Sequence, residues 1–259
     1  MTAHVRDLFD LSGRLALVTG GSRGLGLEIA GGLAEAGARV AIVARRDAWL
    51  RSAEAELSRT GPPPLVLSCD VSKPDQVAST VGAVLAEFGG LDVLVNAAGV
   101  SWGAPAVEMP VERFRDVMEV NLTGTFLVSQ AVGRHMIGAG RGTIINLASV
   151  VALVGSPPDV LDAVGYAASK GAVVSLTRDL AVKWAAHGVR VNAIAPGYFP
   201  TRMTDGVLAR HRVNIEAQVP LGRIGRPGEL KGAAVFLASA ASDYVTGHVL
   251  VVDGGYSAR

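Results

Sequence analysis

The sequence predicts an α/β protein with a doubly wound parallel sheet, helices on both faces and a single domain spanning residues 1–259. Short apolar runs alternate along the chain with segments of helical periodicity, which is the pattern of a parallel sheet covered on both faces. A glycine-rich turn follows the first run. Hydrophobic residues make up 49% of the chain and its mean hydropathy is +0.36, so we expect a large buried core.

The expected strands are short runs rich in Val, Ile and Leu. They are RLALVT from Arg14, RVAIVA from Arg39, PLVLS from Pro64, LDVLVN from Leu91, GTIINLAS from Gly142, RVNAIA from Arg190 and HVLVVD from His248. The expected helices lie between them. They are Leu25–Ala36, Asp47–Ser58, Asp75–Phe88, Val111–Met136, Tyr166–Ala186 and Glu229–Ala238.

Proline and glycine positions agree with these boundaries. Pro110 can occupy the first turn of a helix, and Gly37 and Gly188 can end helices just before the next strand. The cluster Pro62–Pro64 is interpreted as a connecting turn, and no linker or repeat divides the chain. The sequence therefore predicts one domain.

The turn after the first strand reads TGGSRGLG, from Thr19 to Gly26. Glycines allow a sharp turn and let backbone amides approach a pyrophosphate at the positive end of a helix. Such a turn can also be purely structural, but its place after the first strand favours a dinucleotide site. The expected cofactor contacts in this turn are Gly20, Ser22, Arg23, Gly24, Leu25 and Gly26.

The end of the second strand distinguishes between the two nicotinamide dinucleotides. An acidic residue there would accept hydrogen bonds from the adenosine ribose, whereas a 2′-phosphate requires cations. This strand ends with Arg45 and Arg46, and Arg23 can approach the same group from the glycine turn. The sequence therefore favours NADP(H) over NAD(H), although Arg45 and Arg46 could simply begin a solvated helix.

Tyr166 and Lys170 are four residues apart, so both side chains project from one face of a helix. An ammonium beside a phenol favours the phenolate, which would lower the pKa of Tyr166 and make it a usable acid or base. The YxxxK pattern is common on surfaces. Here it occurs together with other motifs in a fixed order: the glycine turn, Asn96–Gly99, Ser149 after the fifth run and Pro196–Gly197 after the sixth.

With these motifs in order, the chain resembles the short-chain dehydrogenase/reductase family from Leu11 to Gly255. The resemblance implies a Rossmann-type sheet of seven parallel strands. It also implies a catalytic tetrad in which Tyr166 is the general acid/base and Ser149 holds the substrate oxygen. Lys170 would bind the nicotinamide ribose and acidify Tyr166, and Asn121 would hold a water in the proton relay.

The resemblance also extends the expected cofactor site. Asp70, with Val71, would contact adenine, and PGYFPT from Pro196 would cover the nicotinamide. The remaining cofactor contacts implied in this way are Asn96, Ala97, Gly99, Tyr166, Lys170, Pro196, Gly197 and Thr201. Asp70 could instead cap a helix. Ser156 is the alternative to Ser149, because the stretch before Tyr166 is longer than the family usually has.

The members that this chain resembles include 3-oxoacyl-carrier-protein reductases and gluconate 5-dehydrogenases, so a 3-oxoacyl thioester or a sugar acid is the expected substrate. The substrate wall is expected to include Ser149, Trp102, Tyr198, Phe199 and Met203. The segment Tyr198–Arg212 is expected to close over the substrate as a lid. The alternative function is a non-catalytic NADPH-binding regulator on the same fold.

Other classes of function are disfavoured by composition. A formal net charge of +1, with acids and bases interspersed, gives no footprint for nucleic acid. We find neither an apolar signal segment nor a membrane span, so a cytoplasmic protein is expected. The five histidines lack clustered partners, so no metal site is expected, and Cys69 is interpreted as a buried structural thiol. The resemblance implies a homotetramer.

Overall fold

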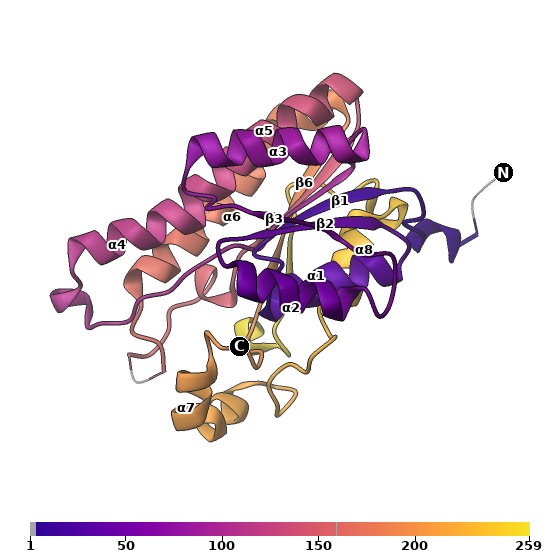
Figure 1. Ribbon diagram of the computed structural model, residues 1–259. Helices are drawn as coiled ribbons and strands as arrows, with labels where there is room; N and C mark the ends of the chain where they lie inside the picture. The colour runs from indigo at the N-terminus through magenta and orange to yellow at the C-terminus, as the bar shows by residue number, and fades with distance from the viewer. Residues whose placement is uncertain (1–3, 159) are drawn as a thin grey trace.

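The apolar runs form one parallel sheet. In a computed structural model, which describes residues 4–158 and 160–259, seven strands lie in the order β3-β2-β1-β4-β5-β6-β7 (Figure 1). The strands are β1 (Leu15–Thr19), β2 (Arg39–Ala44), β3 (Leu65–Ser68), β4 (Val93–Asn96), β5 (Gly142–Leu147), β6 (Val189–Pro196) and β7 (Val249–Val252). The direction of winding changes between β1 and β4, which confirms the predicted doubly wound sheet. Ligands bind such sheets at the carboxyl ends of the strands beside this switch point.

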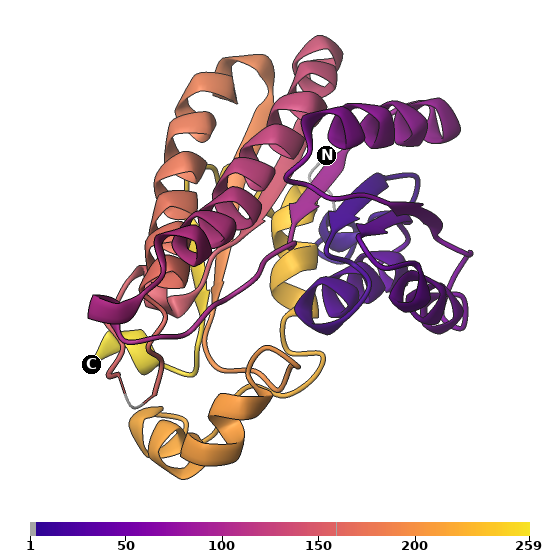
Figure 2. The same cartoon turned by 60° about the vertical axis from the view of Figure 1, so that its left-hand side comes forward.

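Helices cover both faces of the sheet, as the two views in Figure 1 and Figure 2 show. One layer contains α1 (Gly24–Glu35), α2 (Asp47–Leu57) and α8 (Lys231–Ala238), and the other contains α3 (Pro74–Phe88), α4 (Val111–Met118), α5 (Gly124–Ala139) and α6 (Val164–Trp184). Ile29 and Leu33 of α1 are buried in the core between the first layer and the sheet. Val84 of α3 and Met136 of α5 are buried in the core between the second layer and the sheet. The remaining helix, α7 (Asp205–Gln218), stands apart from the sheet in both views.

The helix predicted over Val111–Met136 is wrong as a single α-helix. It consists of α4 and α5 joined by a π-helical turn at Glu119–Thr123. A π turn has one residue more than an α turn, so it shifts the faces of the two halves relative to each other, and such turns often occur at functional sites. Asn121 lies in this turn and is fully buried.

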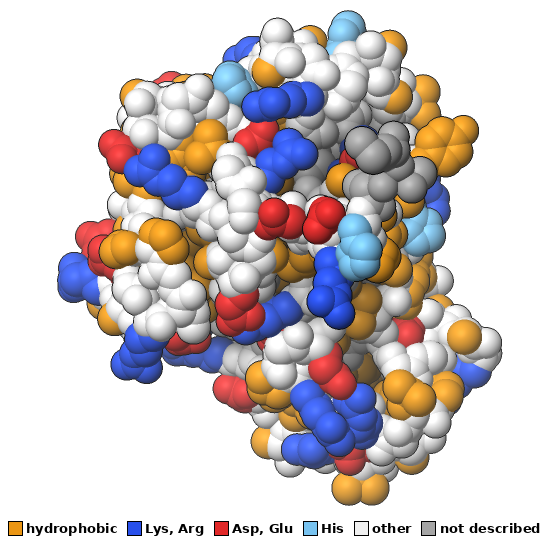
Figure 3. Space-filling view, turned by 90° about the vertical axis from the view of Figure 1, so that its right-hand side faces the viewer, with side chains coloured by type: hydrophobic (Ala, Val, Ile, Leu, Met, Phe, Trp, Pro, Cys, Tyr) orange, Lys and Arg blue, Asp and Glu red, His pale blue; other side chains and the backbone are white. Residues whose placement is uncertain are grey.

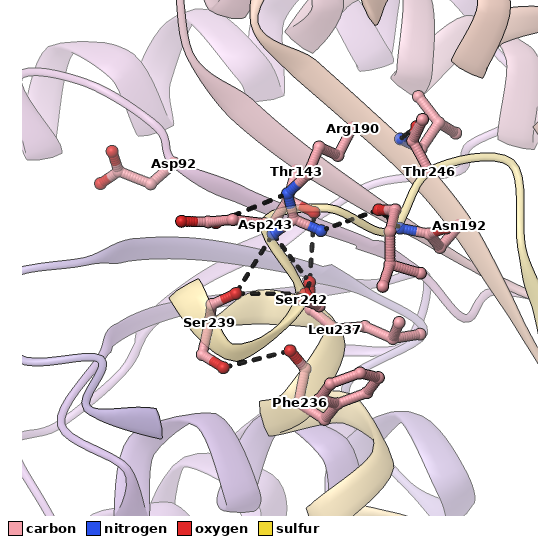
Figure 4. Close-up of polar contacts among 12 residues, drawn as sticks. Asp92, Thr143, Arg190, Asn192, Phe236, Leu237, Ser239, Ser242, Asp243 and Thr246 are labelled. Carbon is pink, nitrogen blue, oxygen red and sulfur yellow. Dashed lines mark hydrogen bonds and ion pairs between the residues drawn. The ribbon is translucent and has the colours of Figure 1, made fainter. Parts of the chain in front are cut away.

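Arg190 ties β6 to the end of α8 (Figure 4). Its guanidinium donates to the carbonyl oxygens of Leu237 at 3.2 Å and Ser239 at 3.3 Å, and it lies 3.8 Å from a carboxylate oxygen of Asp243. The carbonyls at the end of a helix lack partners within the helix, so a cation there stabilises it.

We expect Arg190→Ala to lower the free energy of unfolding by about 2 to 3 kcal/mol, because buried carbonyls lose a charged donor. Urea unfolding checks this. The matched control is Arg59→Ala, which removes an exposed arginine and should change stability by less than about 0.5 kcal/mol. Equal stability of the two variants would contradict the role of Arg190.

The surface carries both signs of charge. Figure 3 shows Lys and Arg side chains interspersed with Asp and Glu over one face of the molecule. Among the helices of the described residues, none has the length and hydrophobicity needed to cross a bilayer.

Candidate active site

One pocket of about 530 Å³ lies at the carboxyl ends of the central strands. Residues that follow β1, β2, β4, β5 and β6 line it, as expected at a switch point. The predicted site residues that it brings together are Gly20, Ser22, Arg23, Gly24, Leu25, Gly26, Arg45, Arg46, Asp70, Val71, Ala97, Gly99, Ser149, Tyr166, Lys170, Pro196, Gly197, Tyr198, Phe199, Thr201 and Met203. Asn96, Trp102 and Asn121 do not line it.

The glycine turn closes so tightly that no side chain can be accommodated at Gly20 or Gly26. A Cβ on Gly26 would lie 2.4 Å from the carbonyl oxygen of Gly20, and one on Gly20 would lie 2.7 Å from the amide nitrogen of Ala98. Gly20 and Gly24 also have positive φ angles, of 67° and 54°. The turn therefore places the first amides of α1 at the pocket, where a helix N-terminus favours an anion.

Arginines gather at the α2 end of the pocket. The guanidinium of Arg23 lies 4.0 Å from the centre of the Trp49 indole, and that of Arg46 lies 4.2 Å from it. Arg45 lies 4.0 Å from a carboxylate oxygen of Asp70. Burial, followed by the charges of neighbouring arginines, lowers the pKa of Arg23. A phosphate at this end would relieve that repulsion and accept several charge-assisted hydrogen bonds.

Asp70 does not cap α3. One of its oxygens accepts hydrogen bonds from the backbone amide of Ser72 at 3.0 Å and from the Ser72 hydroxyl at 2.8 Å, and Lys73 precedes the helix without a side-chain cap. The interpretation as a helix cap is therefore wrong. Asp70 closes a turn and lines the pocket, and its contact with adenine stays a prediction.

Tyr166, Lys170 and Ser149 lie in the same pocket. The ammonium of buried Lys170 donates to the carbonyl of Leu147 at 2.6 Å and lies 5.7 Å from the centre of the Tyr166 ring. Burial lowers the pKa of Lys170 to about 8. The expected pair is therefore assembled, with its lysine fixed by the end of β5.

The expected direction of the Tyr166 pKa shift is wrong. Burial raises the pKa of Tyr166 above its ordinary value, and a hydrogen bond with Ser149 lowers it only in part. The Lys170 ammonium, which donates to the Leu147 carbonyl and lies 5.7 Å from the ring centre, does not offset this desolvation of the phenolate. Tyr166 is thus protonated at neutral pH, the form that can donate a proton.

Asn121 supports the site from behind. Its side-chain nitrogen donates to the carbonyl of Val100 and to the hydroxyl of Ser169, each at 2.9 Å, and its side-chain oxygen accepts from the Val100 amide at 2.8 Å. The side-chain amide of Asn121 thus connects the loop after β4 to α6 through these hydrogen bonds. A role of Asn121 in holding a relay water stays a prediction.

The other end of the pocket carries the candidate substrate wall. Tyr198 and Phe199 are buried, whereas Met203 is exposed. The Tyr198 hydroxyl has no hydrogen-bond partner among the described residues. Ser156 does not line the pocket, which supports Ser149 over it. The lid over Tyr198–Arg212 stays a prediction, and its first two residues, Tyr198 and Phe199, are buried.

Comparison with known proteins identifies the family. The family model described as enoyl-(acyl carrier protein) reductase matches residues 20–257. Gluconate 5-dehydrogenase of Gluconobacter oxydans is 43% identical over 251 residues, which cover 96% of each chain. The chain belongs to the short-chain dehydrogenase/reductase family. It is therefore an oxidoreductase that acts on CH–OH groups, as the sequence predicted.

Two further members are similar over their whole lengths. The 5-keto-D-gluconate 5-reductase of Escherichia coli K12 is 40% identical over 253 residues, covering 97% of this chain and 98% of that one. The crystal structure of gluconate 5-dehydrogenase from Burkholderia cenocepacia J2315, in complex with NADP and tartrate, has a TM-score of 0.93 and 41% identity. The match covers 99% of this chain and 100% of the chain in that crystal structure.

Two predicted contacts of this short-chain dehydrogenase/reductase lie away from the pocket. Asn96 donates to the Ser129 hydroxyl and to the side chain of Asn146, each at 2.9 Å, and so joins β4 to β5 and α5. Trp102 is exposed, with the Arg113 guanidinium 4.6 Å from its ring centre. Both predictions of direct ligand contact are therefore unsupported.

Sequence reasoning missed Trp49 and Arg202, which both line the pocket. Trp49 lies three residues after Arg46 in the first turn of α2, a spacing that could have indicated that they share a helix face. Arg202 directly follows Thr201. Within the described residues, no group of three or more His, Cys, Asp or Glu side chains could hold a metal ion.

Proposed function

We propose that this enzyme interconverts a secondary alcohol and a ketone on a sugar acid of the gluconate type, using NADP(H), with Tyr166 as the general acid/base. The observation that carries the proposal is the meeting of Tyr166, Lys170 and Ser149 in a pocket that also contains the glycine turn and the arginines. The relatives named for gluconate and 5-keto-D-gluconate favour sugar acids over 3-oxoacyl thioesters.

The residues of the pocket fit an NADP(H) molecule. The tight glycine turn would hold the pyrophosphate at the start of α1, and Arg23, Arg45 and Arg46 would hold the 2′-phosphate. A bound nicotinamide supplies or accepts the hydride. NAD(H) lacks the 2′-phosphate that these cations match, so it is the less favoured cofactor.

The chain's own residues would handle the proton. In reduction, the Tyr166 hydroxyl would donate its proton to the substrate oxygen as the carbonyl becomes an alcohol, and Ser149 would donate a hydrogen bond to the same oxygen. Lys170 would bind the ribose hydroxyls and favour the phenolate that remains. In oxidation, the Tyr166 phenolate would take the proton of the substrate alcohol.

Arg45→Asp should weaken NADPH binding by at least about tenfold and shift the preference towards NADH. The change removes a charge-assisted contact and adds repulsion, each worth on the order of 1 to 3 kcal/mol. It also replaces the approach of Arg45 to Asp70 with two like charges.

Titration of both cofactors checks this prediction. The control is Arg59→Asp, the same charge reversal at an exposed residue outside the pocket. An unchanged preference in the Arg45 variant would assign the phosphate to Arg23 or Arg46, or indicate NADH use.

A substrate panel tests the proposed activity. D-gluconate with NADP⁺, 5-keto-D-gluconate with NADPH and an acetoacetyl thioester with NADPH should be compared by kcat/KM. We expect the sugar acids to be preferred. Preference for the thioester would overturn the substrate class while leaving the roles of Tyr166 and Lys170 in place.

The homotetramer also stays a prediction. The resemblance implies that α5 and α6 pair between subunits, and Phe126 on α5 and Val182 on α6 are exposed hydrophobic residues on these helices.

A further inference from the structure

Three arginines surround one indole at the edge of the pocket. The guanidinium groups of Arg23, Arg46 and Arg202 lie 4.0, 4.2 and 5.4 Å from the centre of the Trp49 ring. Arg23 and Arg46 directly precede α1 and α2, whereas Arg202 belongs to the segment between β6 and α7. The segment that precedes α7 therefore lies, through the contact of Arg202 with Trp49, beside the arginines of the proposed 2′-phosphate site.

The charges of this cluster are not balanced by protein. In the described part of the chain, no carboxylate lies within 4.0 Å of Arg23, Arg46 or Arg202, and the nearby Arg45 alone approaches one, at Asp70. The pKa of Arg23 is lowered first by burial and then by the charges of Arg202, Arg46 and Arg45, in that order. Cations held together in this way favour an anion among them.

Arg202 lies within a short segment that leads rigidly into α7. The Thr201 amide donates to the Thr204 hydroxyl at 2.9 Å, and that hydroxyl donates to the Phe199 carbonyl at 2.6 Å. The Asp205 amide, at the start of α7, donates to the Thr201 carbonyl at 2.9 Å. A force on the Arg202 side chain is therefore transmitted to the first turn of α7.

α7 has a small buried face. Ile215 is its one buried residue, Val207 and Leu208 are partly buried against the same apolar cluster, and the helix stands off the sheet (Figure 2). Elements with few buried apolar contacts open at low free-energy cost. One additional charged contact at the start of α7 can therefore change its order.

We infer that Arg202 is a fourth arginine of the 2′-phosphate site and that, through it, the adenosine end of NADP(H) orders α7 beside the substrate pocket. The inference rests on the proposed NADP(H) function. It makes Arg202 a specificity-determining residue that contacts the cofactor and couples cofactor identity to the α7 side of the substrate site. Arg202 would move towards the phosphate and carry the segment from Thr201 to Asp205 with it.

The test uses adenosine 2′,5′-bisphosphate, which has the 2′-phosphate but no nicotinamide, and adenosine 5′-monophosphate, which lacks the 2′-phosphate. Binding is measured by calorimetry and the order of α7 by hydrogen exchange. Arg202→Gln is the test variant. Arg210→Gln is the matched control, because Arg210 is an exposed arginine on α7 that does not line the pocket.

We expect the bisphosphate at saturation to slow amide exchange across α7 by at least about fivefold in the wild type and in Arg210→Gln, but not in Arg202→Gln. Arg202→Gln should bind the bisphosphate about five- to tenfold more weakly and the monophosphate with unchanged affinity.

Three results would overturn the inference. Unchanged affinity of Arg202→Gln for the bisphosphate would remove Arg202 from the site. Equal losses for both nucleotides would assign Arg202 to the 5′-phosphate. Full α7 protection in saturated Arg202→Gln would remove the coupling. If the wild type binds both nucleotides equally, the proposed NADP(H) preference fails too, which distinguishes that failure from the first three.

Discussion

Tyr166→Phe is expected to lower kcat by about 10³-fold in both directions, because a positioned general acid contributes roughly 10² to 10⁴ and the phenylalanine ring has no proton to transfer. NADPH affinity should stay within about twofold, since the phenylalanine ring keeps the partly buried position of the Tyr166 ring and only the hydroxyl is lost. The matched control is Tyr244→Phe, which removes the hydroxyl of a fully exposed tyrosine. Activity of the Tyr166 variant within about tenfold of the wild type would contradict the mechanism.

The pH dependence of the wild type follows from the same residue. Burial raises the pKa of Tyr166 above its ordinary value of 10.0, so the phenol stays protonated through neutral pH. Reduction, for which we propose the phenol as proton donor, should hold its rate until alkaline pH and then fall. The rate of oxidation, for which we propose the phenolate as base, should rise with pH over the same range. Profiles of kcat/KM in both directions, compared with Tyr166→Phe, measure this.

Lys170→Met is expected to have the second largest effect, lowering kcat by about 10² or more and also weakening NADPH binding. The ammonium is buried and donates to the Leu147 carbonyl at 2.6 Å. Its loss removes the proposed ribose contact, the charge beside Tyr166 and the partner of a carbonyl at the end of β5. Methionine has a similar length and no charge, so the fold should be retained.

The control for this variant is Lys183→Met, which changes an exposed lysine on the same helix that is paired with Asp179. Cofactor affinity and kcat should be separated by titration and steady-state kinetics. Unchanged NADPH affinity in Lys170→Met would contradict the double role of the lysine.

The strands could be predicted because parallel strands buried on both faces are continuous apolar runs, and each of the seven runs contains or overlaps an observed strand. The π turn around Asn121 could not be predicted. One extra residue in a turn changes helix geometry without changing the apolar pattern on either side of it. The single helix predicted there follows from that pattern.

The site was predicted best where a motif fixes the backbone. Gly20 and Gly26 are required because the chain approaches itself closely at these positions. Tyr166 and Lys170 could be paired because residues four apart share one face of a helix. The family resemblance implied Asn96 as a cofactor contact. Consecutive side chains of a strand point to opposite sides, and Asn96 lies on the side of Ser129 rather than in the pocket.

Contacts between segments that are distant along the chain could not be predicted from the sequence. Trp49 and Arg202 are far apart along the chain, and only the fold places the Arg202 guanidinium 5.4 Å from the centre of the Trp49 ring. A tryptophan after two arginines is equally compatible with a solvated helix. The raised pKa of Tyr166 was missed for a related reason, because burial of the phenol depends on packing from several elements.

The most direct test of the account is whether D-gluconate reduces NADP⁺ on the purified wild-type enzyme, followed by the absorbance of the reduced nicotinamide and by the ketone formed. We expect one equivalent of NADPH for each ketone, turnover that depends on Tyr166, and a higher kcat/KM with NADP⁺ than with NAD⁺. Tight NADPH binding without turnover of any sugar acid, ketone or thioester in either direction would contradict the enzyme proposed here and indicate a cofactor-binding regulator.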